Sequence, residues 1–345
     1  MKRLQRGLVA GLALAGVFAL SPSAGAEECS LELKYLESSS SSGSSSVSDY
    51  LLRRTSSQSF FMQLMQGRAA QLGAPMPGQS KDFSKIVKKE PEYVSKHPFR
   101  GVMKLGTEQV GFVLDARPPE VEAPEAAAAE SDEKDEDEPP DPAMEEGYAR
   151  LFIDANGNGD LTDDEVIEAE RVRESSRSLG STKYRYLYSD FPRVDVTTEA
   201  DGTKMDYAFL FRVYLRVSDQ LTYASASLSA AAYREGEITL AGKKRQIALV
   251  DYNSNGRFDD KMTIRDVQST DGRIYPSYGD VLLLDYDDAT SGAYVSSYDP
   301  AVRACRHQVS ELVNIDGRFY ELEISPAGDK LSLVPSSSPT GKVTN

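Results

Sequence analysis

The sequence has 345 residues, a formal net charge of −15 and two cysteines. Its length allows one large domain or two smaller ones. Much of the acidity lies between residues 117 and 147, where 13 acidic residues stand against two basic ones. The chain has no basic stripe that could neutralise phosphates, so we do not expect nucleic acid as a partner.

The first 26 residues have the pattern of a secretory signal peptide. Lys2, Arg3 and Arg6 precede 13 apolar residues from Leu8 to Leu20, and small residues follow at 24–26. This order of positive, apolar and small residues is typical of a cleaved leader, and 13 residues are short for a membrane span. We therefore expect a periplasmic or extracellular protein without a transmembrane segment.

Residues 27–90 are predicted to be a flexible, serine-rich leader. Serine dominates residues 38–48, which is typical of a linker. Residues 59–72 are rich in Phe, Met, Leu and Gln and are compatible with a short helix. In an oxidising compartment Cys29 could pair with Cys305, or it could stay free while Cys305 is buried.

Residues 91–334 are predicted to form a mainly β domain of antiparallel, sandwich-like sheets with one or two short helices. The weak alternation over residues 99–114 indicates a hairpin that turns near Gly106. Residues 117–147 contain almost no large apolar side chains, so we expect a disordered acidic insertion. Residues 335–345 should form a frayed tail.

Later β signals are clearer. Residues 149–153 should form a strand, and apolar residues alternate with arginines over 208–217. A hairpin is predicted over residues 237–250. The dipeptides Asp271-Gly272 and Asp316-Gly317 indicate tight turns, and strands are expected at 321–324 and 330–334.

The most informative motif is a complete twelve-residue calcium loop that starts at Asp154. Calcium prefers six to eight oxygen ligands, and an EF-hand loop supplies them at fixed positions around a glycine at position 6, here Gly159. The predicted ligands are Asp154, Asn156, Asn158, the backbone carbonyl of Asp160, Thr162 through a water, and Glu165. Asparagine at positions 3 and 5 leaves few charged ligands, so we expect modest affinity.

A partial copy of this loop follows at Asp251. Asn253, Asn255 and Gly256 repeat positions 3, 5 and 6, and Arg257 occupies position 7, the backbone-carbonyl position. Position 12 is Met262, which cannot ligate a hard cation. Asp259 or Asp260, at positions 9 and 10, would have to close the shell instead.

Strands are predicted before both loops, whereas an EF-hand places its loop between two helices. Residues 164–173 could form a short helix after the first loop, and residues 262–267 look extended after the second. We therefore expect EF-hand-like loops on a β scaffold. Bound calcium would be structural, because the chain shows no helix pair with a Met-rich groove for sensing.

The segments 98–101, 151–162 and 250–260, together with 324–328, resemble a group of uncharacterised exported bacterial proteins. The resemblance covers roughly residues 91–334 and implies a β-rich domain with EF-hand-like loops, but no activity. Met262 departs from the pattern, as does the missing glycine near Asp287 in a third, degenerate fragment.

No catalytic motif is present, so we expect a binding or structural role at the cell envelope or outside it. The sequence has no His-Glu-x-x-His, Gly-x-Ser-x-Gly or phosphate loop, and only two histidines. The alternative is a calcium-stabilised exported hydrolase with a carboxylate pair in a cleft. Tyrosine is abundant, at 18 residues, and we expect it to serve strands rather than a sugar platform.

Overall fold

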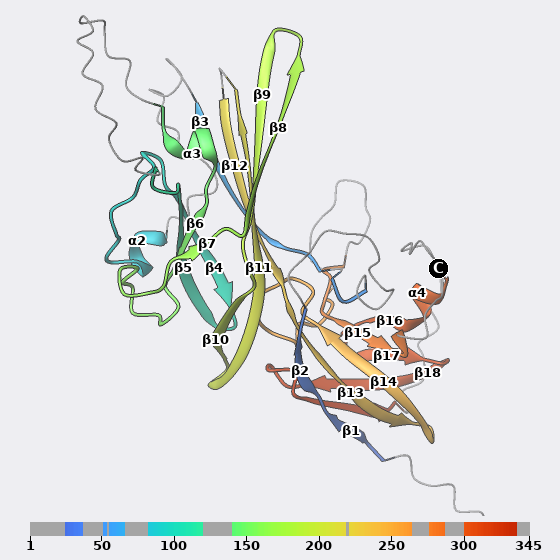
Figure 1. Ribbon diagram of the computed structural model, residues 1–345. Helices are drawn as coiled ribbons and strands as arrows, with labels where there is room; N and C mark the ends of the chain where they lie inside the picture. Colours follow the sequence, from blue (N-terminus) through green and yellow to red (C-terminus); the bar gives the residue numbers. More distant parts are fainter. Residues whose placement is uncertain are drawn as a thin grey trace, which may run out of the picture.

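The structure is a computed structural model that describes residues 25–36, 51–53, 55–65, 82–119, 140–218, 221–263, 276–286 and 300–336. Over these ranges the chain forms four antiparallel sheets and three short helices (Figure 1). The prediction of a mainly β fold with antiparallel sheets is confirmed. The first loop lies between two strands, and the second follows a strand.

A large six-stranded sheet forms the centre of the molecule. Its central strand alternates as the sequence predicts: Phe209, Phe211 and Val213 are buried, while Arg212 on the other face is exposed. Such alternation places one face of the sheet on a core and leaves the other open. The strands are β3 (Gln58–Met65), β12 (Leu221–Ala230), β11 (Thr203–Val217), β9 (Thr182–Asp190) and β8 (Arg171–Leu179), with β10 (Val194–Ala200) also paired to β11.

A four-stranded sheet packs against the buried face of the large sheet (Figure 1). Phe112 of this small sheet contacts Phe211 at 5.1 Å and Phe60 at 4.9 Å between ring centroids. Burying one such aromatic side chain contributes roughly 1.5–3 kcal/mol, so these contacts hold the two layers together. The strands are β4 (Phe99–Leu105), β5 (Glu108–Asp115), β6 (Arg150–Ile153) and β7 (Ile167–Glu168).

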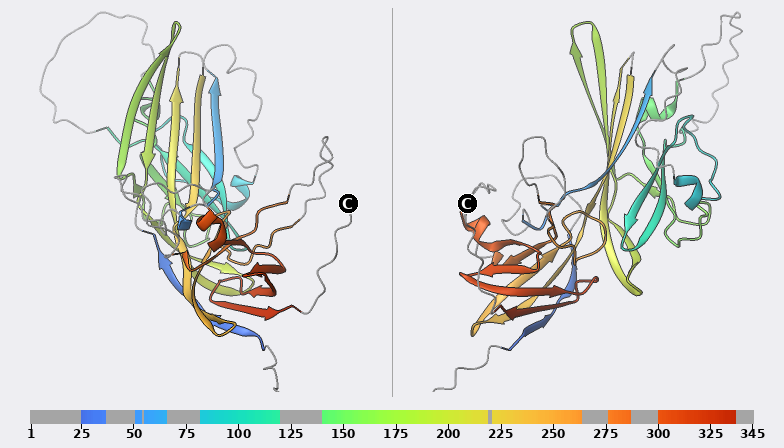
Figure 2. Two further views of the ribbon diagram at one scale, coloured as in Figure 1. Left: turned by 90° about the vertical axis from the view of Figure 1, so that its right-hand side faces the viewer. Right: turned by 180° about the vertical axis from the view of Figure 1, so that it is seen from behind.

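Two further sheets complete the fold at the other end of the molecule (Figure 2). The first has the order β16 (Arg306–Gln308), β15 (Val281–Leu284), β14 (Lys243–Val250), β13 (Ala232–Leu240) and β2 (Glu32–Tyr35). The second has the order β1 (Glu27–Ser30), β19 (Lys330–Pro335), β18 (Arg318–Ile324) and β17 (Leu312–Ile315). Both sheets contribute buried side chains, such as Ile238 and Leu333, to the main core.

The helices are short: α2 (Phe83–Ile86), α3 (Pro142–Glu146) and α4 (Pro300–Cys305). Asp141 caps α3 by accepting a hydrogen bond from the Ala143 amide at 3.0 Å, which satisfies a helix donor that would otherwise lack a partner. Among the described residues, no helix is long and apolar enough to cross a membrane.

The predicted hairpins are confirmed. β4 and β5 turn at Gly106, and β13 and β14 turn at Gly242, each glycine having a positive φ. β17 and β18 turn at Asp316-Gly317. These glycines adopt a left-handed conformation that other residues reach only at a cost.

Two helix predictions are wrong. Residues 58–65 form β3, which pairs with β12, because Met62 packs into the core while Phe61 lies exposed on the opposite face. Residues 167–168 and 171–179 form β7 and β8 instead of a helix after the first loop. In both places pairing with a neighbouring strand overrides local helix propensity.

The expectation of a flexible leader over residues 27–90 is corrected, because β1, β2 and β3 each join a sheet. Part of the acidic insertion is also ordered, since α3 lies within residues 117–147. Cys29 and Cys305 carry free thiols, so the disulfide alternative is not found.

Several predictions fall outside the described residues. They concern most of the signal peptide (residues 1–24), the serine-rich linker, residues 120–139 of the acidic insertion, the turn at Asp271-Gly272, residues 264–267 and the tail beyond residue 336.

Candidate metal centre

The first loop connects β6 to β7 and is anchored on both sides. The Asp154 amide donates to the Gly111 carbonyl of β5 at 3.0 Å. On the other side, the Lys88 amide donates to the Gly159 carbonyl at 2.7 Å, and the Leu161 amide donates to the Lys89 carbonyl at 3.0 Å. Gly159 has φ +80, and a Cβ there would lie 2.7 Å from the Ile86 carbonyl oxygen, so this close approach requires glycine.

The side chains of the first loop fold inward through a ladder of backbone contacts. Asp154 Oδ2 accepts from the Gly159 amide at 3.1 Å, Asn156 Oδ1 from the Asn158 amide at 2.9 Å, and Asn158 Oδ1 from the Asp160 amide at 2.7 Å. The contacts therefore join position 1 to 6, 3 to 5 and 5 to 7. An amide oxygen has two lone pairs, so each asparagine keeps capacity for a cation.

Two carboxylate oxygens in this loop are buried without a hydrogen-bond partner. They are Asp154 Oδ1 and Asp164 Oδ2. Burial, followed by repulsion from Asp163 and Asp154, raises the pKa of Asp164. An orphaned anionic oxygen is costly in a protein interior, and a hard cation is a partner that would satisfy it. The oxygen-only donor set and the two orphaned oxygens fit calcium.

Asp163, at position 10, faces the two asparagines of the loop. Its Oδ1 accepts from Asn156 Nδ2 at 3.3 Å, and its Oδ2 accepts from Asn158 Nδ2 at 2.8 Å. Asp163 and Glu165, the predicted ligand at position 12, are both exposed. Position 10 therefore bonds the two asparagines and position 11 has a buried oxygen, whereas the sequence pattern assigned the closing role to position 12.

Lys89 lies beside positions 7 and 9 of the first loop. Its Nζ donates to Asp160 Oδ2 and to Thr162 Oγ1, both at 2.7 Å. The hydrogen bond from Lys89 is the main cause that lowers the pKa of Asp160 to about 2. The side chains of Asp160 and Thr162 are thus engaged by Lys89, and the predicted ligand at position 7 is the Asp160 backbone carbonyl.

The second loop follows β14 and repeats the same hydrogen-bond pattern. Asp251 Oδ2 accepts from the Gly256 amide at 2.7 Å, Asn253 Oδ1 from the Asn255 amide at 3.1 Å, and Asn255 Oδ1 from the Arg257 amide at 2.8 Å. These contacts again join positions 1 to 6, 3 to 5 and 5 to 7. Two loops nearly a hundred residues apart thus adopt one local fold.

Asp260 occupies the place in the second loop that Asp163 has in the first. Its Oδ2 accepts from Asn253 Nδ2 at 2.7 Å and from Asn255 Nδ2 at 2.6 Å. Asp259 instead accepts two hydrogen bonds from the Arg257 guanidinium, at 2.9 Å on Oδ1 and 2.8 Å on Oδ2. Of the two carboxylates proposed to close this loop, Asp260 is the one that converges with the asparagines.

The second loop is more deeply buried than the first. Asp251 is fully buried and accepts a 2.7 Å hydrogen bond from Tyr207 of β11. Burial raises the pKa of Asp251 to about 7, although the Tyr207 hydroxyl and the Gly256 amide oppose the shift. A bound cation would favour the ionised form of this carboxyl group.

A further buried carboxylate, Asp280, was not found from the sequence. It accepts from the Tyr252 and Asp260 amides, both at 2.9 Å. Burial raises its pKa well above the usual range, and the charges of Asp251 and Asp260 add to the shift. Asp280 precedes β15 and reaches the loop only through sheet pairing, so no local motif marks it.

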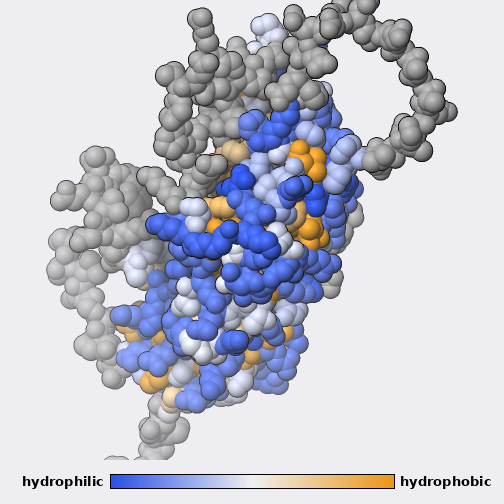
Figure 3. All heavy atoms as spheres, turned by 90° about the vertical axis from the view of Figure 1, so that its left-hand side faces the viewer, coloured by the Kyte–Doolittle hydropathy of each residue, from blue (hydrophilic) through white to orange (hydrophobic). Residues whose placement is uncertain are grey.

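The β4–β5 hairpin contacts both loops. At its turn the Gly106 amide donates to the Asn255 carbonyl at 2.6 Å, and further along β5 the Gly111 carbonyl accepts from Asp154. A cavity of about 470 Å³ lies beside the first loop and includes Asp154, Glu108 and Glu199 in its lining. Figure 3 shows that the molecular face on the side of the small sheet is mostly hydrophilic.

Within the described ranges, no group of three His, Cys, Asp or Glu side chains could hold a metal ion by itself. A cation in either loop would therefore depend on the asparagine oxygens and backbone carbonyls, as in other calcium loops. Comparison with known proteins gave no match to this chain, whether by family model, curated sequence or solved structure.

Proposed function

We propose that this chain is an exported calcium-binding protein, in which two EF-hand-like loops hold structural calcium ions in a β-rich domain. The observation that carries the proposal is the orphaned Asp154 Oδ1, buried at position 1 of a loop whose hydrogen-bond ladder recurs at Asp251. The signal-peptide pattern of residues 1–26 supports export.

The position of the loops supports a structural role. The first loop joins β6 to β7, and the second contacts β11 through Tyr207 and the β4–β5 turn through Gly106. A cation would neutralise carboxylates that otherwise repel one another in buried positions. It would thereby fix the large sheet, the small sheet and β14 relative to one another.

The ligands we propose for the first loop are Asp154, Asn156, Asn158, the Asp160 carbonyl and a carboxylate from Asp163 or Asp164. Those for the second are Asp251, Asn253, Asn255, the Arg257 carbonyl and Asp260. Each set offers hard oxygen donors only, which favours calcium over softer transition metals.

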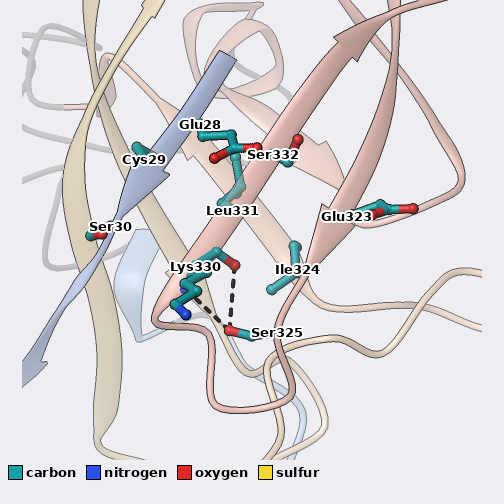
Figure 4. Close-up of a pocket in the computed structure, with 9 residues that line it drawn as sticks. All are labelled: Glu28, Cys29, Ser30, Glu323, Ile324, Ser325, Lys330, Leu331 and Ser332. Carbon is teal, nitrogen blue, oxygen red and sulfur yellow. Dashed lines mark hydrogen bonds between the residues drawn. The ribbon is translucent and has the colours of Figure 1, made fainter. Parts of the chain in front are cut away.

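The alternative of a hydrolase requires a carboxylate pair in a cleft away from the loops. Glu28 of β1 and Glu323 of β18 line a hollow of about 650 Å³, and both pair with Ser332 on the strand between them (Figure 4). Both glutamates are solvent-exposed. They do not form the desolvated pair that acid catalysis on a glycan uses, so the binding role remains our proposal.

The test is a calorimetric calcium titration of chelator-treated protein, with thermal melts in calcium and in chelator. We expect two binding events, one lost in Asp154→Asn and the other in Asp251→Asn. Calcium at a hundred times its Kd should stabilise the fold by about 2.7 kcal/mol per site. The matched control is Asp195→Asn, which removes an exposed carboxylate of β10 that pairs with Arg193. This variant should leave both binding events intact. Absence of heat and of any melting shift would refute the proposal.

A further inference from the structure

The open face of the large sheet carries a continuous array of aromatic rings. Phe61 of β3 contacts Tyr223 of β12 at 6.1 Å between ring centroids, and Tyr223 contacts Tyr214 of β11 at 6.3 Å. The array continues from Tyr214 to β9, reaching Tyr186 at 6.1 Å and Tyr188 at 5.3 Å. Tyr184 extends the array at its far end, 6.3 Å from Tyr186.

Strand register explains why these rings share one face. Tyr214 is paired with Tyr188 on one side and with Ser225 on the other, and residues opposite each other in a sheet point the same way. Neighbouring positions on the same strands, such as Leu187 and Val213, are buried in the core. The left panel of Figure 2 shows this face of β8, β9, β11, β12 and β3 turned toward the viewer, with the small sheet behind it.

Arginines are interleaved with the rings, although the chain as a whole is acidic. The Arg216 guanidinium lies 5.8 Å from both Tyr184 and Tyr223, and the Arg173 guanidinium lies 5.7 Å from Tyr188. Arg177 and Arg212 occupy the same face, since they are paired with Tyr184 and Ser227. Positive charge on this face of a chain with net charge −15 indicates an anionic ligand.

The positive charge of this face is only partly neutralised within the protein. Arg173 and Arg212 share one carboxylate, Asp190, at 2.8 and 2.6 Å. Arg216 Nε is buried and has no hydrogen-bond partner. Stacking of a guanidinium between aromatic rings orients its fork without using its hydrogen-bond donors, so it remains able to bind a carboxylate.

We propose that this face, defined by Phe61, Tyr184, Tyr186, Tyr188, Tyr214, Tyr223, Arg173, Arg177, Arg212 and Arg216, binds an acidic polysaccharide of the uronic-acid class. With the arginines of β8 included, the face crosses five strands, a span of about 19 Å at the usual strand spacing, which suits an extended polymer rather than a small molecule. The aromatic rings would pack against sugar rings, and the arginines would pair with the carboxylates.

Hydroxyl groups on the same face favour a sugar over a nucleic acid. Ser225, Ser227 and Ser229 lie at alternate positions of β12 on this face, and Ser225 is paired with Tyr214 of β11. Hydroxyl side chains both donate and accept hydrogen bonds, which matches the hydroxyls of a sugar. Every ring of a uronic-acid polymer carries free hydroxyls, whereas the sugars inside a DNA strand carry none.

The experiment is calorimetric titration of the full chain with a soluble hexameric galacturonate in sodium buffer. The same measurement is made with a neutral glucan hexamer and with single-stranded oligothymidylate. We expect binding of the galacturonate, at least tenfold weaker binding of the neutral sugar, and an affinity that falls as salt is raised. Equal or tighter binding of the oligothymidylate would mean that the ligand of this face is a single-stranded nucleic acid and not a glycan. Binding of none of the three would overturn the proposal.

Variants locate the site on this face. Tyr186→Ala, Tyr214→Ala and Arg216→Gln should each weaken galacturonate binding at least fivefold. The matched controls are Tyr278→Ala, which removes an exposed tyrosine outside the sheet, and Arg318→Gln on β18; both should bind like the unchanged chain. A thermal melt establishes that each variant is folded. Unchanged binding in all three folded face variants would place the site elsewhere.

Discussion

The hydroxyl of Tyr207 donates a 2.7 Å hydrogen bond to Oδ2 of Asp251 and so joins the central strand β11 to position 1 of the second loop. Both residues are fully buried. Since the Gly256 amide donates to the same oxygen, Asp251 directs its other oxygen toward the interior of the loop. The core of the large sheet thus holds the side chain that we propose as the first ligand of this loop.

Removing this hydroxyl should weaken both the fold and the second calcium site. We expect Tyr207→Phe to lower the free energy of unfolding by about 1–3 kcal/mol, because a buried carboxylate loses a donor. Calcium affinity of the second loop should fall, which calorimetry would measure. Tyr148→Phe is the control: it loses a buried hydrogen bond to the His97 carbonyl, and it should cost stability without affecting either calcium event. Equal calcium affinities in the two variants would contradict this coupling.

A second prediction concerns the residue that closes each loop. Asp163→Asn and Asp260→Asn should each lower calcium affinity of their own loop about tenfold or more, because these carboxylates converge with the asparagines. Glu165→Gln should have a smaller effect, since Asp163 is the carboxylate that bonds both Asn156 and Asn158. Calcium titrations of the three variants give the ranking. A larger loss of calcium affinity in Glu165→Gln than in Asp163→Asn would show that position 12 closes the loop.

The loop motifs were predictable because their ligand positions are local in sequence. The hairpins were predictable for the same reason, as turn glycines lie between alternating residues. By contrast, the run Phe60-Phe61-Met62 has no clear period, so only pairing with β12 shows that it forms a strand. Asp280 lies 20 residues beyond Asp260 in the chain and reaches the loop only through β15.

The aromatic and arginine face illustrates the same limit. The sequence led us to expect tyrosines that merely serve strands and to find no basic stripe. No strand contributes more than three of the rings or more than two of these arginines, so the whole face is not visible along the chain. Antiparallel register brings them together on one face.

The β4–β5 turn should be necessary for the second loop. Gly106 has φ +61, and a Cβ there would lie 2.0 Å from the Glu199 carbonyl oxygen. We therefore expect Gly106→Ala to destabilise the fold by about 1–3 kcal/mol through strain and displacement, and to weaken calcium binding in the second loop, whose Asn255 carbonyl it contacts. Gly242→Ala is the control, because Gly242 has a similar φ but nothing within 4 Å of an added Cβ. In that control, urea unfolding should show a loss of stability from backbone strain. Calorimetry should show unchanged calcium affinity.

Stability should depend on pH through His307 of β16. Burial lowers the pKa of His307, and the nearby Arg245 guanidinium lowers it further, while Asp316 opposes the shift. The unfolded chain therefore takes up a proton at this histidine near pH 6.5, before the folded chain does. Its contribution to stability is present above that pH and is lost as the pH falls toward the lower folded pKa. In saturating calcium, urea unfolding between pH 5 and 7.5 should show a steeper loss for the unchanged chain than for His307→Gln. Parallel curves would show that His307 titrates alike in the folded and unfolded chains.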